Sequence, residues 1–274
     1  MIELHKYSGA GNDFVVLDGR KEDVSEFRTA GRIAALCDRR TGFAAADGRI
    51  GADGLMILTE DPDYDFRMEY YNSDGSGGMM CGNGGRCIVA FADALGLKPA
   101  DGRVFRFAAA DGEHTGEILA REGDLKTVRL RMIDVHEFRP ALDGWFLDTG
   151  TRHFVRFVPD VEAVDIEKEG YAARWDPLFA PIGANANFVS VDPDGTLRVR
   201  TFEKGVEAET LACGTGITAS AIAAYLEGPA AAVSPGVSVH FGIQARIARL
   251  AVDFRPGQNC FTDVYLTGPA DEIR

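Results

Sequence analysis

Residues 81–96 read CGNGGRCIVAFADALG, and residues 213–228 read CGTGITASAIAAYLEG. Each stretch opens with Cys-Gly-x-Gly, continues as a mostly apolar run long enough for a helix, and ends in a glycine suited to a helix C-cap. The two stretches predict one helix from after Cys81 to Leu95 and another from after Cys213 to Glu227. They also indicate that one structural unit occurs twice in the chain.

The residues before the two cysteines support an internal repeat. Phe66–Asn72 ends nine positions before Cys81, and the similar run Leu197–Glu203 ends ten positions before Cys213. Further upstream, residues 14–18 (FVVLD) align with residues 188–192 (FVSVD). We therefore predict two pseudo-equivalent halves, each with a cysteine at a helix N-terminus. The alternative is that short apolar runs align by chance.

The remaining elements indicate the fold class. A third helix is predicted over Thr29–Asp38. Short apolar runs bounded by turn residues predict strands at Phe14–Leu17, Leu55–Leu58, Phe66–Tyr71, Val104–Ala108, Thr127–Met132, Phe154–Val158, Phe188–Val191, Leu197–Phe202 and Val237–Phe241. Many short strands with few helices favour an α+β or barrel-like fold over regular βαβ alternation.

Composition narrows the class of protein. The chain has 274 residues, enough for one large domain or two of average size, and 46% of them are hydrophobic. Its 42 acidic residues against 29 Lys and Arg give a formal charge of −13, which argues against nucleic acid or an anionic membrane as the main partner. Five cysteines, an odd number, are not typical of a disulfide framework. We expect a cytoplasmic enzyme or binding protein without a membrane span.

The two repeated cysteines suggest a particular chemistry. Unpaired N–H groups at a helix start carry partial positive charge, so a cysteine there has a lowered pKa and becomes a thiolate more easily. Flanking glycines let the backbone approach an anion closely. Two such thiols across one small ligand suit racemisation, in which one thiolate removes a proton and the opposing thiol delivers one to the other face. The helix N-termini would hold the α-carboxylate of an amino acid.

Other chemistries fit the cysteines less well. A zinc site would need closer Cys or His spacing than that of Cys81 and Cys87. Residues 214–219 match the dinucleotide pattern G-x-G-x-x-A, but no strand leads into them and no acidic residue follows at the required distance. A Cys/His hydrolase could use His153, but it would leave the second Cys-Gly-x-Gly unexplained. The other cysteines, Cys37, Cys87 and Cys260, have apolar neighbours and are expected to be packing residues.

Further motifs lead to a family. They are Ser8–Phe14 (SGAGNDF), Gly51–Leu55 (GADGL), Asn72–Ser76 (NSDGS), Cys81–Cys87 (CGNGGRC), Ala184–Asn185, Glu203–Gly216 (EKGVEAETLACGTG) and Thr267–Ala270 (TGPA). In this order and together, the chain resembles the diaminopimelate epimerases, and the resemblance extends over essentially its whole length.

The resemblance implies an architecture and an activity. It implies two similar α/β halves, each wrapping a curved sheet around a central helix, with the active site in the cleft between them. The halves would be residues 1–125, to which 265–274 return, and residues 126–264. The resemblance implies an isomerase that needs neither a cofactor nor a metal. The implied reaction converts LL-diaminopimelate to the meso form, which serves lysine and peptidoglycan synthesis. A homodimer is the usual assembly of the family.

The resemblance also implies roles for individual residues. Cys81 and Cys213 would be the two acid/base thiols. The N–H groups of Gly82, Asn83, Gly214 and Thr215 would hold the α-carboxylate. The side chains of Asn12, Asn72, Asn185 and Lys204 would bind the distal amino-acid end of the substrate. His153 and Glu203 would lie beside the thiols, bind the α-amino group and tune proton transfer.

The chain departs from the family pattern at four positions. Thr151 and Arg152 stand where an amide and a proline are frequent, Lys204 replaces a common arginine, and Gly54 stands where some members carry glutamine. A lysine loses the bidentate contact that arginine makes to a carboxylate. These changes concern recognition of the distal end, so the alternatives are a proline- or histidine-type racemase on the same scaffold, or a non-catalytic amino-acid-binding protein.

Overall fold

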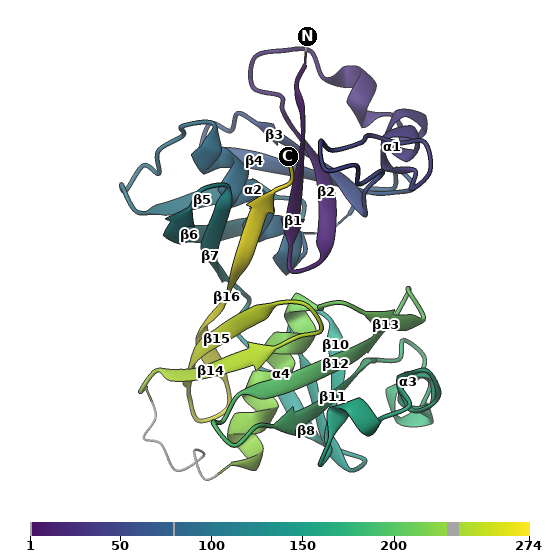
Figure 1. The fold of residues 1–274 in the computed structure, drawn as a ribbon. Coiled ribbons are helices and arrows are strands. Elements are labelled where there is room, and N and C mark those ends of the chain that lie inside the picture. The colour runs from purple at the N-terminus through teal and green to yellow at the C-terminus, as the bar shows by residue number, and fades with distance from the viewer. Residues whose placement is uncertain (1, 79, 229–235) are drawn as a thin grey trace. The chain divides into compact units, whose positions relative to one another are not determined.

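The computed structural model describes residues 2–78, 80–228 and 236–274. The chain divides into two compact units. The N-terminal unit comprises Met1–Leu130 and the terminal segment Gly268–Arg274, and the C-terminal unit comprises Arg131–Thr267. Each unit combines a curved sheet with few helices, so the predicted α+β class is confirmed (Figure 1).

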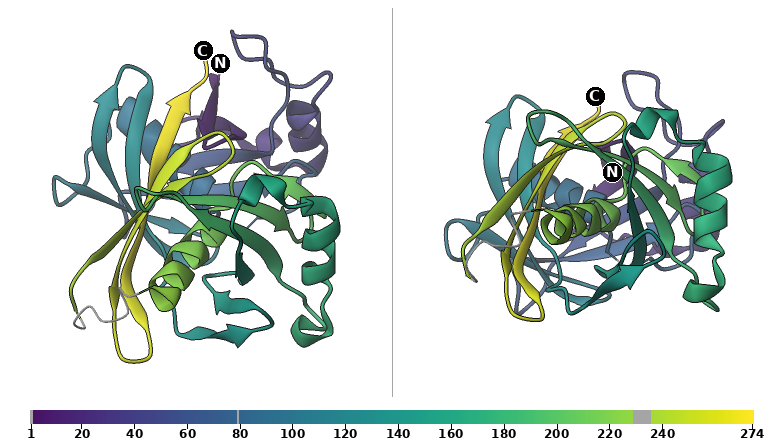
Figure 2. Two further views of the ribbon diagram at one scale, coloured as in Figure 1. Left: turned by 60° about the horizontal axis from the view of Figure 1, so that its bottom comes forward. Right: turned by 90° about the horizontal axis from the view of Figure 1, so that it is seen from below.

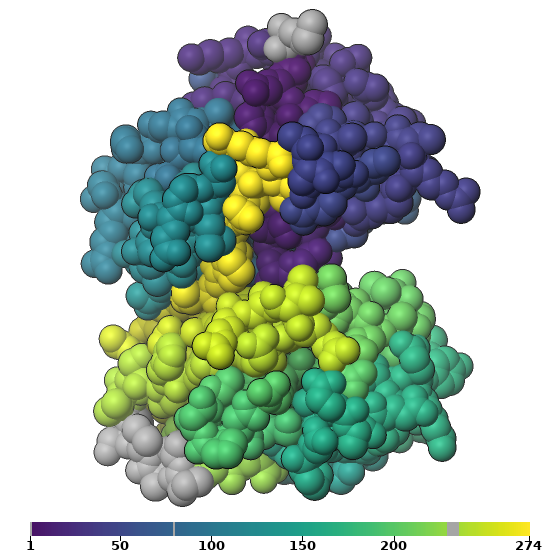
Figure 3. Space-filling view, in the orientation of Figure 1, coloured from purple at the N-terminus to yellow at the C-terminus, as the bar shows by residue number. Residues whose placement is uncertain are grey.

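The sheet of the N-terminal unit closes on itself. In hydrogen-bonded order its strands are β1 (Leu4–Gly9), β2 (Asn12–Asp18), β3 (Gly54–Thr59), β4 (Phe66–Asn72), β5 (Val104–Ala109), β6 (Gly112–Glu122), β7 (Leu125–Arg131) and the end of β16 (Phe261–Glu272). The end of β16 pairs with β7 through Gly268 to Asp271, and with β1 through Asp271 and Glu272. On the surface of this unit, the yellow C-terminal segment accordingly lies between teal and purple segments (Figure 3).

A helix fills the N-terminal ring. Helix α2 (Gly82–Ala94) contacts β1, β2, β3 and β6, and its residues from Gly82 to Ala92 are buried. A helix buried on all faces is expected to carry small or apolar residues all round, and apart from Asn83 and Arg86 the buried residues of α2 are small or apolar. Helix α1 (Ala30–Cys37) packs against β3 and begins at Thr29, whose side chain accepts a hydrogen bond from the Arg32 N–H.

The C-terminal unit has the same plan. Its strands follow the order β16, β15 (Arg249–Pro256), β14 (Val239–Gln244), β12 (Leu197–Glu203), β11 (Asn185–Val191), β10 (Arg152–Phe157), β9 (Gly144–Asp148) and β8 (Glu137–Ala141), with β13 (Ala208–Thr210) paired to β12. Helix α4 (Gly214–Glu227) contacts six of these strands and is enclosed by them (Figure 2). Helix α3 (Ile166–Arg174) packs on β11, β12 and β13.

Strand directions define the internal repeat. The pairs β2–β3 and β4–β5 are parallel and flank the antiparallel pair β3–β4. The pairs β10–β11 and β12–β14 are parallel and flank the antiparallel pair β11–β12. Strand β4 therefore corresponds to β12, and α2 corresponds to α4, as predicted.

One part of the predicted repeat is wrong. The alignment of residues 14–18 with 188–192 equates β2 with β11, whereas strand order and direction equate β2 with β10 and β3 with β11. The physical reason is that β2, β3 and β11 are buried along most of their length and that the centre of β10 is buried as well. Such strands read as near-continuous apolar runs, and apolar runs alone do not distinguish neighbours.

The predicted elements are confirmed, and several others were missed. The three predicted helices are α1, α2 and α4, and each predicted apolar run overlaps a strand. The missed elements are β1, β6, β8, β9, β13, β15, β16 and α3. In β15 and β16 buried residues alternate with partly buried or exposed ones, so these strands lack the apolar runs that mark the others. Across the described residues, every helix is too short or too polar to span a membrane.

Candidate active site

Cys81 is the residue that starts α2. Its backbone is extended, and its Sγ accepts a hydrogen bond from the Gly84 N–H at 3.3 Å. The thiol therefore caps the helix as a serine or aspartate would. A Cβ on Gly84 would lie 3.3 Å from the sulfur, so the second glycine of the motif leaves room for the thiol. Gly82 and Asn83, whose N–H groups begin the helix, are buried.

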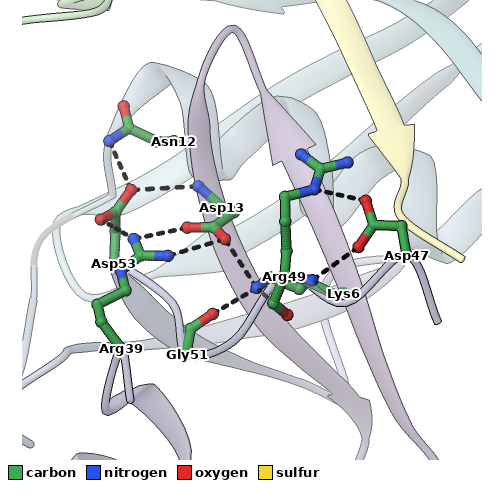
Figure 4. A network of polar contacts seen from close by, with 8 residues as sticks. All are labelled: Lys6, Asn12, Asp13, Arg39, Asp47, Arg49, Gly51 and Asp53. Carbon is green, nitrogen blue, oxygen red and sulfur yellow. Dashed lines mark hydrogen bonds and ion pairs between the residues drawn. The ribbon is translucent and has the colours of Figure 1, made fainter. Parts of the chain in front are cut away.

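Asn12 lies near the start of α2 and is held by an acidic side chain. Its Nδ2 donates to Asp53 Oδ2 at 2.9 Å, and the same oxygen accepts the backbone N–H of Asp13 at 3.2 Å. Arg39 forms ion pairs with both Asp53 and Asp13 (Figure 4). Burial opposes ionisation of Asp13, but Arg39 and Lys6 outweigh it and lower the pKa of this carboxyl. The carboxyl group of Asp53 thus fixes the orientation of the Asn12 amide.

The Asn12 amide continues into α2. Asn83 Nδ2 donates to Asn12 Oδ1 at 2.6 Å, and Arg86 Nη2 donates to Asn83 Oδ1 at 2.7 Å. Arg86 is fully buried and also donates to the carbonyls of Gly82 and Pro269. Burial lowers the pKa of Arg86 to about 10, so it stays charged at neutral pH. The structure therefore brings Asn12 and Asn83 together on a rigid hydrogen-bonded chain.

Asn72 occupies a different setting in the same unit. It is the last residue of β4 and begins the turn that leads toward α2. Its Nδ2 donates to Ser76 Oγ at 3.0 Å, and its backbone N–H donates to the Ser76 carbonyl. These contacts are those of a turn residue, and they place the amide in the loop between β4 and Cys81.

Cys213 starts α4 in the same structural position as Cys81. Its backbone is extended, and 9% of the residue surface is exposed. Its Sγ lies 3.4 Å from the Oγ1 of Thr215, which belongs to the first turn of the helix. The turn between β9 and β10 holds this helix end, because Thr149 Oγ1 donates to the Thr215 carbonyl at 2.8 Å.

His153 is buried next to the Cys213 end of α4. Asn187 Nδ2 lies 3.0 Å from His153 Nδ1 and also donates to the Phe154 carbonyl at 3.0 Å. A carbonyl only accepts, so this amide atom is the nitrogen, and His153 Nδ1 is an acceptor. Burial lowers the pKa of His153 to about 3. The ring is therefore neutral and carries its hydrogen on Nε2.

The Nε2–H of His153 faces two hydroxyl groups. It lies 2.9 Å from Thr151 Oγ1 and 2.9 Å from Thr215 Oγ1, and the two hydroxyl oxygens are 3.0 Å apart. His153 is thus connected to Cys213 through Thr215. The His153 side chain is fully buried. Asn187 contacts its Nδ1, and the two threonine hydroxyl groups contact its Nε2.

Asn185 lies on β11 and Glu203 on β12, and Lys204 follows in the turn after β12. Asn185 begins β11, and its Oδ1 accepts the Lys204 N–H at 2.7 Å. Its Nδ2 donates to the Arg152 carbonyl at 3.1 Å and to Thr151 Oγ1 at 3.3 Å. Glu203 ends β12, immediately before Lys204. The amide of Asn185 therefore links the Glu203–Lys204 corner to the threonine pair.

Sequence reasoning missed several members of these networks. Asp53 and Arg86 lie inside quoted motifs but received no role, and Asn187 and the Thr151 hydroxyl were not considered as neighbours of His153. A signal for Asn187 exists, since a polar residue stands in an otherwise apolar run at residues 186–189. In residues 2–78, 80–228 and 236–274, no group of three His, Cys, Asp or Glu side chains is arranged to hold a metal ion.

The buried neutral state of His153 predicts acid sensitivity. The unfolded chain binds a proton at His153 below its ordinary pKa of about 6.5, whereas the folded protein binds it only near pH 3. This group therefore reduces the free energy of unfolding as pH falls, by about 1.4 kcal/mol per pH unit between these limits. Urea unfolding between about pH 4.5 and 6 should show a shallower pH dependence for His153→Gln than for the wild type. Equal slopes would contradict a neutral buried His153.

The fold of this chain is found in solved structures. A phenazine biosynthesis protein of the PhzF family from Bacillus anthracis matches with a TM-score of 0.74 and 12% identity, covering 100% of this chain and 97% of that chain. A probable proline racemase from Agrobacterium radiobacter matches with a TM-score of 0.65 and 16% identity, covering 98% and 90%. These similarities define the fold class, which is that of the PhzF and proline racemase structures.

Sequence comparisons define the family within this fold. The profile of the family described as "Diaminopimelate epimerase" matches residues 4–126 and 145–241. A diaminopimelate epimerase from Flavobacterium psychrophilum is 40% identical over 272 residues, or 99% of this chain and 98% of the relative. One from Chlorobaculum tepidum is 39% identical over 271 residues, or 97% of each. The chain belongs to the diaminopimelate epimerase family of cofactor-independent isomerases, which confirms the resemblance.

Proposed function

We propose that this protein converts LL-diaminopimelate to meso-diaminopimelate with the thiols of Cys81 and Cys213 as acid and base. The observation that carries the proposal is the repeated position of the two cysteines. Cys81 and Cys213 occupy the N-cap positions of α2 and α4, which are the buried helices at the centres of two units with the same strand order. Family membership supports the substrate, since the relatives are named diaminopimelate epimerases.

The proposed reaction needs both sulfur atoms. The thiolate of one cysteine removes the α-proton from one face of the α-carbon, so that an S–H bond forms and the electron pair of the C–H bond remains on carbon. The thiol of the other cysteine then gives its proton to the opposite face, and its sulfur keeps the electron pair. The reverse reaction uses the same atoms with exchanged roles, which is the expectation for general acid–base catalysis in both directions.

The backbone at the two helix starts would stabilise the negative charge that develops during this transfer. The N–H groups of Gly82 and Asn83, and those of Gly214 and Thr215, are proposed to hold the α-carboxylate. Helix N-termini bind anions through unpaired N–H groups and the helix dipole. Support comes from the burial of Gly82, Asn83 and Gly214, because such donors act more strongly where water is excluded.

Other side chains are proposed to bind the rest of the substrate. Asn12, Asn72, Asn185 and Lys204 would contact its distal end, and Glu203 would accept hydrogen bonds from the α-amino group. The fixed amide orientations of Asn12 and Asn185 support a role in recognition, because preorganised groups lose little freedom on binding. His153 would support the thiol of Cys213 from its buried position.

The cellular setting belongs to the same proposal. We place the enzyme in the cytoplasm, as a homodimer that serves lysine and peptidoglycan precursor synthesis. The family relationship and the five free cysteines support a reducing environment. Sedimentation of the purified protein near the mass of two chains is the expected result, and a single chain mass would contradict the dimer.

The decisive experiment is proton NMR of the reduced protein with LL-diaminopimelate in deuterium oxide. The expected result is loss of the α-proton signal together with appearance of the meso isomer. Proline and histidine, tested in parallel, should keep their α-protons. Exchange with one of these amino acids instead would retain the two-thiol mechanism and change the substrate. If none of the three amino acids exchanges its α-proton although the protein is folded and reduced, the protein is a binding protein and not an epimerase.

A further inference from the structure

The hydroxyl groups of Thr151 and Thr215 form a bridge between His153 and Cys213. The Thr215 hydroxyl lies 2.9 Å from His153 Nε2 on one side and 3.4 Å from Cys213 Sγ on the other. Thr151 Oγ1 lies 3.0 Å from Thr215 Oγ1 and 2.9 Å from the same Nε2. Thr151 is one of the positions at which the chain departs from the family pattern, so its contacts bear on what that departure does.

The donors in this cluster have fixed directions. His153 Nε2 carries a hydrogen, because Asn187 donates to Nδ1 and the ring is neutral. Neither hydroxyl can therefore donate to His153. Asn185 Nδ2 also donates into the pair, to Thr151 Oγ1 at 3.3 Å. With the oxygens occupied by these donors, the Thr215 hydroxyl can direct its hydrogen to the Cys213 sulfur, and the Thr151 hydroxyl can direct its hydrogen to Thr215 Oγ1.

We propose that Thr151 and Thr215 are positioning residues whose paired hydroxyls, oriented by His153, donate a hydrogen bond to the Cys213 thiolate. This inference rests on the proposed function, in which Cys213 alternates between thiolate and thiol. When Cys213 is a thiolate, the Thr215 hydroxyl points its hydrogen at the sulfur. When Cys213 is protonated, the S–H can donate to Thr215 Oγ1, and the Thr215 hydrogen turns to Thr151 Oγ1. The pair thus serves both protonation states without movement of heavy atoms.

Thr151, where the family frequently has an amide, provides a different set of hydrogen-bond donors and acceptors beside Thr215. A side-chain amide at this position would present an NH2 group and a carbonyl with fixed donor and acceptor sides. A hydroxyl can reverse its donor direction by rotation about one bond. Thr151 would therefore act on the charge state of Cys213, through Thr215.

The test is the pH dependence of alkylation of Cys213 by iodoacetamide, followed by peptide mass spectrometry without substrate. Thr215→Val keeps the shape and backbone N–H but removes the hydroxyl, and the pH of half-maximal rate should rise by about one unit, a tenfold slower reaction at lower pH. Thr151→Val should shift it in the same direction, and Thr215→Ser should restore the wild-type value. The variants are compared by the pH at which alkylation reaches half of its maximal rate. Limited access of iodoacetamide to the buried thiol lowers the rate by the same factor at every pH and leaves this midpoint unchanged.

Two controls show whether the shift is specific to Cys213 and to the hydroxyl groups of Thr151 and Thr215. Cys81, in the other unit, is alkylated in the same samples and should keep its profile. Thr218→Val removes a buried hydroxyl of α4 that donates to the Gly214 carbonyl, and Cys213 should titrate as in the wild type. An unchanged Cys213 profile in both valine variants at positions 151 and 215 would overturn the proposal. Failure of serine to restore the profile, or an equal shift at Cys81 or in Thr218→Val, would also overturn it. Alkylation needs no turnover, so this result is separate from the NMR test of function.

Discussion

Replacement of either Cys81 or Cys213 by alanine should abolish epimerisation of diaminopimelate, with a loss of at least about 10³-fold in rate. Each direction of the reaction needs a base on one face of the α-carbon and an acid on the other, and each variant lacks one of them. The folds should persist. Alanine at position 81 removes one cap to the Gly84 N–H, a change of about 1 kcal/mol in the free energy of unfolding.

The single-thiol variants separate proton removal from inversion. The thiol that remains can still remove the α-proton of one stereoisomer and return a deuteron to the same face. Proton NMR in deuterium oxide should therefore show slow exchange of one isomer in Cys81→Ala, of the opposite isomer in Cys213→Ala, and inversion in neither. Cys260→Ala, a half-buried cysteine in the loop before β16, is the control and should remain active. Epimerisation by both single-thiol variants would exclude the two-thiol mechanism.

Gly216→Ala should lower activity by about 10²-fold and also destabilise the protein. A Cβ at this position would overlap Asn187 Oδ1 and lie 3.1 Å from His153 Cε1. Both neighbours are fully buried and cannot move aside without breaking the hydrogen bond between them. Overpacking of a buried site costs about 1–3 kcal/mol. The displaced His153 would no longer orient the threonine pair beside Cys213, so the chemical step should be affected more than substrate binding.

The same substitution at Gly31 is the matched control. Gly31 lies on the exposed face of helix α1, and a Cβ there meets nothing within 4 Å. Alanine is the better helix former by about 1 kcal/mol, so Gly31→Ala should leave activity unchanged and raise the free energy of unfolding slightly. Thermal unfolding and kcat with KM for both variants provide the comparison. A Gly216→Ala variant with wild-type kcat would show that the contact between α4 and His153 is not needed.

The central helices and their caps could be predicted from the sequence because they depend on local features. The N-caps Cys81 and Cys213 and the apolar runs that follow are contiguous, and α2 and α4 begin where expected. The buried strands could be predicted for the same reason. The closure of the N-terminal sheet into a ring could not be predicted. The pairing of β1 with β16 joins residues at opposite ends of the chain, and both strands carry polar residues.

The sequence motifs name the residues of the candidate site, but they do not predict the contacts among these residues. Cys81, Asn83, Cys213 and Thr215 stand in the repeated pattern itself. The partners that orient them come from distant segments: Asp53 reaches Asn12 from 41 positions away, and Asn187 reaches His153 from 34. A buried amide such as Asn187 has no local signature beyond its polarity, because its role depends on which strand becomes its neighbour.

Strand β16 has a consequence for synthesis of the protein on the ribosome. Its first part pairs with β15, but Gly268 to Asp271 complete the ring of the N-terminal unit beside β7 and β1. The first 130 residues therefore leave the ribosome without the last strand of their sheet. The edges of β1 and β7 remain unpaired until nearly the whole chain has been made. The part of the protein that is translated first is then the part that finishes folding last, and a chain truncated before Gly268 should leave it open to aggregation.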